Sequence, residues 1–200
     1  DQMQFQVSKD WEVGADMLGV YRRESGVNRS GTAYLNENKD SQLTGGTLYS
    51  RSKLTEAQQL NVDVSYSYFF DRYFQDFVNP VTKDVTTDTK EFYGSSLIHY
   101  NYNWMSNQSL TLGTENIWER IDSDRMQVTT VGNVPTRERT RNALYTENKW
   151  VILRDYNLIL QPGVRYDFTS TSRDAVSPRI GVRIDPVRDI TLKAGYGWGF

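Results

Sequence analysis

Residues 141–200 alternate between apolar and polar side chains with a period of two, and this pattern constrains the fold more than any other feature. Between residues 157 and 168 the apolar parity is Leu158, Leu160, Pro162, Val164, Tyr166 and Phe168. Between residues 190 and 200 it is Ile190, Leu192, Ala194, Tyr196, Trp198 and Phe200. Successive side chains of a strand point to opposite faces, so each segment has one apolar, aromatic face and one polar or glycine-rich face. Repeated along a chain, this pattern is typical of a β-barrel, and its aromatic bias favours a membrane-embedded one.

The composition fits a membrane protein only if strands, not helices, cross the bilayer. Mean hydropathy is −0.65, and the longest clearly apolar run, residues 150–153, is far shorter than the ~20 residues that a spanning helix needs. The net charge of −2 gives no electrostatic reason to expect nucleic acid as a partner. The absence of cysteine excludes disulfides, thiolate catalysis and cysteine metal ligands.

The alternation predicts an all-β, antiparallel, up-and-down transmembrane barrel with about ten strands in this chain. The predicted strands are 2–8, 12–24, 42–53, 58–76, 89–104, 108–121, 141–152, 157–170, 176–184 and 189–200. Short connections at 9–11, 54–57, 105–108, 153–156 and 185–188 alternate with longer polar ones at 25–41, 77–88, 122–140 and 171–175. Outer-membrane barrels show this asymmetry, with tight periplasmic turns and long extracellular loops.

Aromatic residues near the predicted turns and loops indicate the two membrane interfaces. Trp11, Trp104, Trp150 and Tyr156 are expected in a periplasmic girdle, and Tyr21, Tyr73 and Phe74 near the outer one. A soluble lipocalin-like barrel also alternates, but two features count against it. Segments such as 58–76 exceed the ~9–11 residues that a strand needs to cross the hydrocarbon, as strands that project beyond the membrane would. The alternate faces also carry too many large aromatics for the interior of a small barrel.

The order of turns predicts that residues 1–200 are one partial barrel domain. If the short turns are periplasmic, both ends of the chain reach the extracellular rim, whereas single-chain outer-membrane barrels keep both termini in the periplasm. An opposing signal is the end of the chain, where Gly195, Trp198 and Phe200 resemble the terminal recognition signal of complete outer-membrane barrels. The two alternatives, a fragment and a complete ten-stranded barrel, therefore remain open at this point.

Three motifs in the second half of the chain resemble the TonB-dependent outer-membrane receptor family. Ser177-Pro178-Arg179-Ile180-Gly181-Val182, followed by Ala194-Gly195-Tyr196-Gly197-Trp198-Gly199-Phe200, is similar to the mid-to-late barrel of that family. Tyr145-Thr146-Glu147-Asn148-Lys149-Trp150 resembles its Tyr-x-Glu-Asp-x-Trp strand, with Asn148 in place of the usual Asp. Pro162-Gly163-Val164-Arg165-Tyr166 resembles its Pro-Gly-x-Arg-Tyr strand.

This resemblance implies a plugged barrel of about twenty-two strands in the outer membrane of a Gram-negative bacterium. It implies energy-coupled uptake of a metal chelate such as a ferric siderophore, haem or cobalamin. The plug domain and the remaining strands are expected outside residues 1–200. The expected partners are outer-membrane lipid, lipopolysaccharide, the chelate, and an inner-membrane energy-transducing complex reached through the plug. The alternative function is a self-contained small outer-membrane pore or adhesin.

The sequence does not favour an enzyme, and it predicts neither a cofactor nor a metal site. His99 is the only histidine, so multi-histidine metal sites are excluded and any hydrolytic triad would depend on this one residue. Its parity is of mixed polarity, which predicts that His99 is a hydrogen-bonding residue facing the lumen.

Two groups of residues are candidates for function. The inward parity carries the predicted lumen-facing residues Asp63, Glu115, Glu147, Arg165, Asp167 and Lys193, as a charge-paired wall, a plug-docking surface or a ligand path. The extracellular loops carry the predicted ligand-binding residues Tyr34, Tyr73, Arg125, Arg137 and Arg139. Arginine offers a planar fork to carboxylates and aromatic rings pack on planar ligands, so these loop residues suit an anionic chelate. Each also has an ordinary explanation, as a solvated loop or girdle residue.

Overall fold

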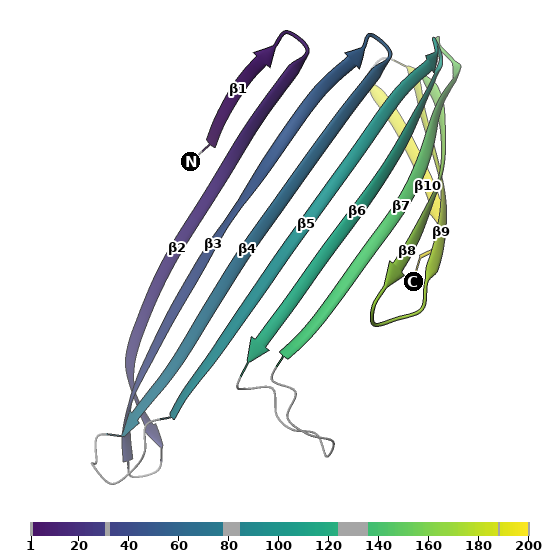
Figure 1. The fold of residues 1–200 in the computed structure, drawn as a ribbon. Coiled ribbons are helices and arrows are strands. Elements are labelled where there is room, and N and C mark those ends of the chain that lie inside the picture. The colour runs from purple at the N-terminus through teal and green to yellow at the C-terminus, as the bar shows by residue number, and fades with distance from the viewer. Residues whose placement is uncertain (1, 31–32, 78–84, 124–135, 188, 200) are drawn as a thin grey trace.

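The computed structural model describes residues 2–30, 33–77, 85–123, 136–187 and 189–199, which form one antiparallel sheet with the strands in sequence order (Figure 1). The strands are β1 (Gln2–Ser8), β2 (Trp11–Ser30), β3 (Ala33–Thr55), β4 (Gln58–Phe77), β5 (Val85–Met105), β6 (Gln108–Ser123), β7 (Thr136–Leu153), β8 (Leu158–Thr169), β9 (Ala175–Val187) and β10 (Ile190–Gly197). The predicted fold class and the ten-strand meander are confirmed. None of the described residues belongs to a helix that is long and apolar enough to cross a membrane.

The sheet is open within the described residues, because β1 pairs only with β2 and β10 pairs only with β9. It therefore differs from the closed ten-stranded barrel that the end of the sequence suggested, and resembles a section of a larger wall. The sheet is curved, and its short turns lie together at one end in Figure 1.

Three of the predicted long loops are wrong in extent, because strands occupy much of them. The predicted loop 25–41 is a continuous hairpin in which β2 and β3 pair as far as Ser30 and Ala33. Strand β5 already begins at Val85 and β7 at Thr136, within the predicted loops 77–88 and 122–140. A strand that is exposed on both faces needs no apolar parity, so these extensions have the composition of loops. The fourth predicted loop, 171–175, does connect β8 to β9, and only Ala175 belongs to a strand.

The height of the wall changes along the sheet. Strands β2 to β5 contain 20, 23, 20 and 21 residues, whereas β8, β9 and β10 contain 12, 13 and 8. Since the short turns share one end, the difference appears at the other end as a step down from β7 to the hairpin of β8 and β9 (Figure 1).

The register gives the sheet two chemically different faces. We call the face with the even-numbered residues of β3 to β10 and the odd-numbered residues of β1 and β2 the apolar face, and the opposite one the charged face. On the apolar face, paired rows such as Leu48 with Val64 and Tyr166 with Val176 continue from strand to strand. These side chains are uncovered: Leu48 is 65% exposed and Val64 is 47% exposed. An apolar surface this continuous indicates contact with a membrane or another apolar partner.

Aromatic rings mark two levels of the apolar face. Trp11, Trp104 and Trp150 lie beside the short turns and are exposed. Farther along the strands, Phe92 lies 4.7 Å from Tyr68 and 6.4 Å from Trp118, measured between ring centroids. Tyr21 is on this face, as predicted for the second girdle, but Tyr73 is not: its parity places it on the charged face.

Among the residues whose burial is described, the few buried side chains all lie on the charged face. They are Ile117, Ala143, Ile159, Asp71 and Ser123, each at most 7% exposed. Side chains converge on the concave side of a curved sheet, so this burial indicates that the charged face is the concave one. The core is therefore a thin layer on the inner side of the wall.

Two tyrosines on the charged face lie over glycines of neighbouring strands. The Tyr49 ring of β3 covers Gly14 of β2, and the Tyr145 ring of β7 covers Gly113 of β6, so closely that a Cβ on either glycine would overlap the ring. The absent side chain lets each aromatic ring lie flat on the sheet and supports its curvature.

We predict that Gly113→Ala destabilises the folded barrel by about 1–3 kcal/mol, because the added methyl group displaces the Tyr145 ring. Denaturant unfolding in detergent micelles measures the change. Gly181→Ala is the control, since the nearest atom to its Cβ would be 3.7 Å away on the same face. Equal losses at the two glycines would contradict the packing account.

A polar cluster fixes the turn between β7 and β8 to the end of β9. Asn157 adopts a positive φ of 44°, and its Nδ2 donates a hydrogen bond of 2.6 Å to Oδ2 of Asp185. Arg183 forks onto the same carboxylate, with its Nε 3.1 Å from Oδ1 and its Nη2 3.0 Å from Oδ2. The hydrogen bonds from Arg183 and Asn157 hold the pKa of Asp185 well below its usual range.

We predict that Asp185→Asn lowers the free energy of unfolding at pH 7 and that this loss shrinks as the pH falls. A carboxyl group with a depressed folded-state pKa stabilises fully above its unfolded pKa of about 4 and progressively less below it. Unfolding of the wild type and the variant at pH 7, 4 and 2.5 tests the sign. A difference that stays constant across this range would show that Asp185 acts only through neutral hydrogen bonds.

Candidate functional site

The charged face brings the polar residues of distant strands together. All six residues that the sequence predicts to face the lumen lie on it: Asp63, Glu115, Glu147, Arg165, Asp167 and Lys193. Five of the six take part in hydrogen bonds or ion pairs across strands or along one strand. The sixth, Lys193, lies on the edge strand β10, where Arg183 is its register partner.

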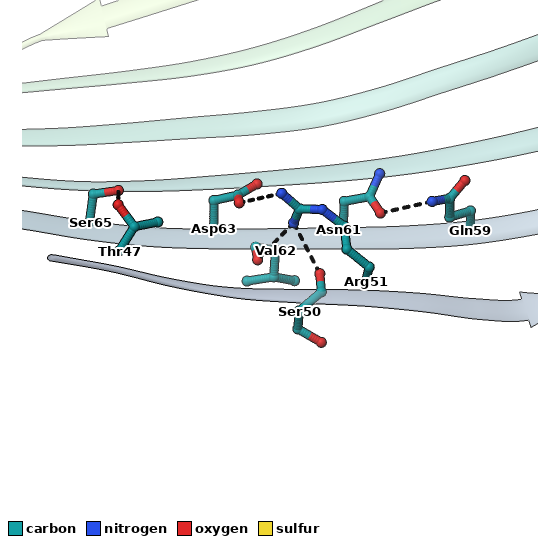
Figure 2. A network of polar contacts seen from close by, with 8 residues as sticks. All are labelled: Thr47, Ser50, Arg51, Gln59, Asn61, Val62, Asp63 and Ser65. Atoms are coloured by element: carbon teal, nitrogen blue, oxygen red, sulfur yellow. Dashed lines mark hydrogen bonds and ion pairs between the residues drawn. The ribbon is translucent and has the colours of Figure 1, made fainter. Parts of the chain in front are cut away.

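The first cluster on this face joins β3 to β4 (Figure 2). Nη2 of Arg51 lies 2.5 Å from Oδ1 of Asp63, and Nη1 of the same guanidinium donates to the carbonyls of Ser50 and Val62. Next to the ion pair along the strands, the hydroxyls of Thr47 and Ser65 share a hydrogen bond of 2.9 Å. The cluster therefore ties the two strands together through side chains as well as through the backbone.

The second cluster is built around Arg165, which crosses a strand to reach its partner. Its Nη2 lies 2.5 Å from Oε2 of Glu115 on β6, and its Nε lies 2.9 Å from Oδ1 of Asp167 on β8. Strand β7 runs between Arg165 and Glu115. There it places Tyr145, the register partner of Arg165, and Ala143, which pairs with both Glu115 and Asp167 and is 1% exposed. A small side chain at this position leaves room for the guanidinium above it.

The third cluster repeats this arrangement one strand further along. Arg179 of β9 forms an ion pair with Glu147 of β7, and Gln161 donates a hydrogen bond to the same carboxylate. Between Arg179 and Glu147 the register places Gly163 of β8. A Cβ on Gly163 would lie 3.2 Å from Nε of Arg179, so the glycine provides the space that the arginine uses.

The second and third clusters border a hollow of about 400 Å³ on the charged face, lined by Leu97, His99, Tyr145 and the ion-paired Glu115, Arg165 and Arg179, among others. The His99 and Tyr145 rings meet edge to face with centroids 5.5 Å apart. Nε2 of His99 and the hydroxyl of Tyr145 are both buried and have no hydrogen-bond partner among the described residues. His99 thus lies on the predicted face, but its Nε2 makes no hydrogen bond within the described part of the chain.

The described residues do not assemble a metal site. No group of three or more histidine, cysteine, aspartate or glutamate side chains is placed to hold an ion in the described part of the chain. What the clusters provide is a row of fixed, paired charges with arginine donors pointing across the wall. Such a surface suits contact with water, a polar polypeptide or an anionic solute.

Four of the five predicted ligand-binding residues belong to strands in the described part of the chain, which corrects their expected location on loops. Arg137 and Arg139 are on the charged face of β7, and Nε of Arg139 lies 3.3 Å from Oε2 of Glu119. Tyr73 lies on β4, three strands away from β7. Its hydroxyl donates a hydrogen bond of 2.8 Å to Oε1 of Glu37. Tyr34 belongs to β3, but only its backbone is described. Arg125 lies outside the described residues.

Sequence reasoning did not single out Arg141 and Tyr145, although both lie in the predicted strand 141–152, and it assigned the preceding run 137–140 to a loop. The run is instead the start of β7, where Arg137, Arg139 and Arg141 share the charged face. The arginines recur at i, i+2 and i+4, which is strand periodicity and was visible in the sequence.

The open sheet, with an uncovered apolar face and a charge-paired concave face, is the wall of a membrane β-barrel. A family model described as TonB dependent receptor-like, beta-barrel, matches residues 4–200. The chain therefore belongs to the TonB-dependent receptor family, as its motifs predicted, and its location is the outer membrane of a Gram-negative bacterium. Members of this family are receptors and transporters.

Several solved structures share this fold. The outer membrane transporter YddB from Escherichia coli matches with a TM-score of 0.70 and 16% identity, over 98% of this chain and 30% of that chain. The FrpB iron transporter from Neisseria meningitidis (F5-1 variant) matches with a TM-score of 0.73 and 10% identity, over 97% and 35%. The RagAB peptide importer in its open-open state matches with a TM-score of 0.70 and 10% identity, over 98% and 31%. This chain thus spans about a third of the length of these structures. Among curated proteins none matches significantly.

We predict that Arg165→Met destabilises the barrel by about 1–2 kcal/mol, because it leaves the carboxylates of Glu115 and Asp167 without their shared cation. The value is below that of a fully buried pair because Arg165 is 35% exposed. Arg22→Met is the control: Arg22 is on the same face and is 73% exposed beside Glu24, so its loss is expected to stay below about 0.5 kcal/mol. Denaturant unfolding in micelles compares the two, and equal losses would refute the crossing role of Arg165.

Proposed function

We propose that this chain forms part of the barrel wall of an outer-membrane receptor for energy-coupled uptake of a metal chelate, such as a ferric siderophore, haem or cobalamin. The two unlike faces of the sheet are the main support for this proposal. One face is continuous and apolar, and the other is lined by ion pairs from β3 to β9. The apolar face would contact outer-membrane lipid and lipopolysaccharide. The charged face would line the lumen.

In this proposal Asp63, Glu115, Glu147, Arg165, Asp167 and Lys193 form the lumen wall. Residues 1–200 are one partial barrel domain, and the plug and the remaining strands belong to other parts of the protein. Two buried polar groups in the hollow, Nε2 of His99 and the hydroxyl of Tyr145, have no partner among the described residues. Buried polar atoms usually find a partner, so these two groups support the proposal that a polar polypeptide packs against this wall. The plug would also carry the connection to the inner-membrane energy-transducing complex.

Ligand capture is assigned to the end of the wall away from the short turns. Tyr34, Tyr73, Arg137 and Arg139 all belong to the strand ends on that side, and Arg125 is assigned there by its position in the sequence. Arginine and tyrosine side chains at the rim suit an anionic chelate with planar groups. Family membership and the shared fold with an iron transporter support the choice of a metal chelate.

Uptake by a strain that lacks the gene tests the proposal. Three probes are supplied separately: radiolabelled ferrioxamine, haem and cobalamin. We expect uptake of one of them to fall to background, to return with the wild-type gene, and to be abolished by a protonophore. Unchanged uptake of all three probes, in a deletion strain whose wild-type parent carries the protein in its outer membrane, would contradict the metal-chelate assignment.

We predict that Val64→Arg destabilises the barrel by about 2–4 kcal/mol if the apolar face meets lipid at mid-bilayer. Ser65→Arg is the matched control, because Ser65 is the next residue of β4 and lies on the charged face beside Thr47. Its effect is expected to be small, since the added cation stays among water and polar groups. Unfolding in lipid vesicles measures both variants. Equal losses at Val64 and Ser65 would reject the assignment of the two faces.

A further inference from the structure

A second hollow lies on the charged face at the step in the wall, where β7, β8 and β9 reach their ends away from the short turns. Its volume is about 330 Å³, and its lining includes Arg139, Arg141, Asp167, Thr169, Arg173 and Ser177. The hollow is separate from the one beside His99, although Ser177 borders both. Only residues 139–177 contribute to it, so the described part of three adjacent strands and one short loop builds the whole site.

The lining of this hollow is strongly cationic in a chain whose net charge is −2. The lining contains three arginines and one carboxylate, that of Asp167, which is already held by Arg165 at 2.9 Å. Arg139 already forms an ion pair with Glu119. Nε of Arg141 is buried and has no hydrogen-bond partner among the described residues. A buried guanidinium N–H without an acceptor is costly, and an oxyanion is the group that satisfies it best.

The loop that carries Arg173 is held in place on both sides. Ser170 and Thr140 exchange hydrogen bonds, with the Ser170 N–H donating to the Thr140 carbonyl and the Thr140 N–H donating to Oγ of Ser170, both at 3.0 Å. The Thr169 hydroxyl accepts a hydrogen bond of 2.9 Å from the Ser172 N–H. On the other side, the Tyr166 hydroxyl donates to Asp174 at 2.6 Å. An anchored loop loses little conformational freedom when a ligand binds.

We propose that this hollow, between Arg139, Arg141 and Arg173, is a binding subsite for an oxyanion group of the transported ligand, a carboxylate or a phosphate. The inference rests on the proposed function and adds the chemical class of group recognised at the rim. Guanidinium groups of Arg141 and Arg173 supply forked N–H donors, and the hydroxyls of Thr169 and Ser177 are further donors beside them.

Calorimetric titration of the full-length receptor, purified in detergent, tests the subsite with two probes. Tricarballylate supplies carboxylates without a metal, and inorganic phosphate supplies the alternative oxyanion. We expect saturable binding of one of the two by the wild type, and the bound probe identifies the group. The double variant Arg141→Gln/Arg173→Gln is expected to weaken that binding at least tenfold, about 1.4 kcal/mol.

Arg22→Gln is the matched control, since it removes one cation from the same face at the edge of the sheet. The affinity of this variant for the bound probe is expected within twofold of the wild-type value. If the double variant is not recovered in folded form, Arg173→Gln alone, in the exposed loop, takes its place with the same expectation. Absence of binding of both probes to the wild type, or equal affinity in the arginine variant and the Arg22 control, would overturn the subsite. Normal chelate uptake in the deletion-complementation assay alongside either result would show that only the subsite fails, not the proposed function.

Discussion

The unbroken ladder of backbone pairing from β1 to β10 is the constraint on which the rest of this structure depends. Side chains alternate along each strand, so the register decides which face every residue joins. A slip of one residue between β6 and β7 would exchange the two faces of β7 to β10. It would carry Glu147, Arg165 and Asp167 onto the apolar face. In a bilayer an unpaired backbone group costs several kcal/mol, so membrane location in turn favours a continuous ladder.

Charge pairing on the concave face depends on small residues as much as on the charges themselves. Arg165 reaches Glu115 over Ala143, and Arg179 reaches Glu147 over Gly163. In both cases an arginine crosses one whole strand at its smallest side chain. The wall is thus held by cross-links that span three strands, in addition to the backbone ladder. The step down to β8 and β9 then brings the loop of Arg173 level with Arg139 and Arg141, which creates the cationic hollow at the rim.

Much of this architecture follows from the sequence alone, because period-two alternation reports directly on a two-faced strand. The predicted strand 157–170 matches β8, and the inward parity of Arg165 and Asp167 agrees with the register. The extent of the β2–β3 hairpin could not be predicted, because a strand wet on both faces has no apolar parity to detect. Pairing of Tyr145 with Gly113 also escaped prediction, since it depends on the register between two strands more than thirty residues apart.

The most direct test of the two-faced wall is a site-directed spin-label scan of β4 in the full-length protein, reconstituted in lipid vesicles. Residues 1–200 contain no cysteine, so single cysteines can be placed at each position from 60 to 70 without removing any from this segment. The account predicts that even-numbered positions are accessible to oxygen dissolved in lipid and odd-numbered positions to a water-soluble nickel chelate, with a period of two. Loss of this alternation, or alternation in the opposite phase, would contradict it.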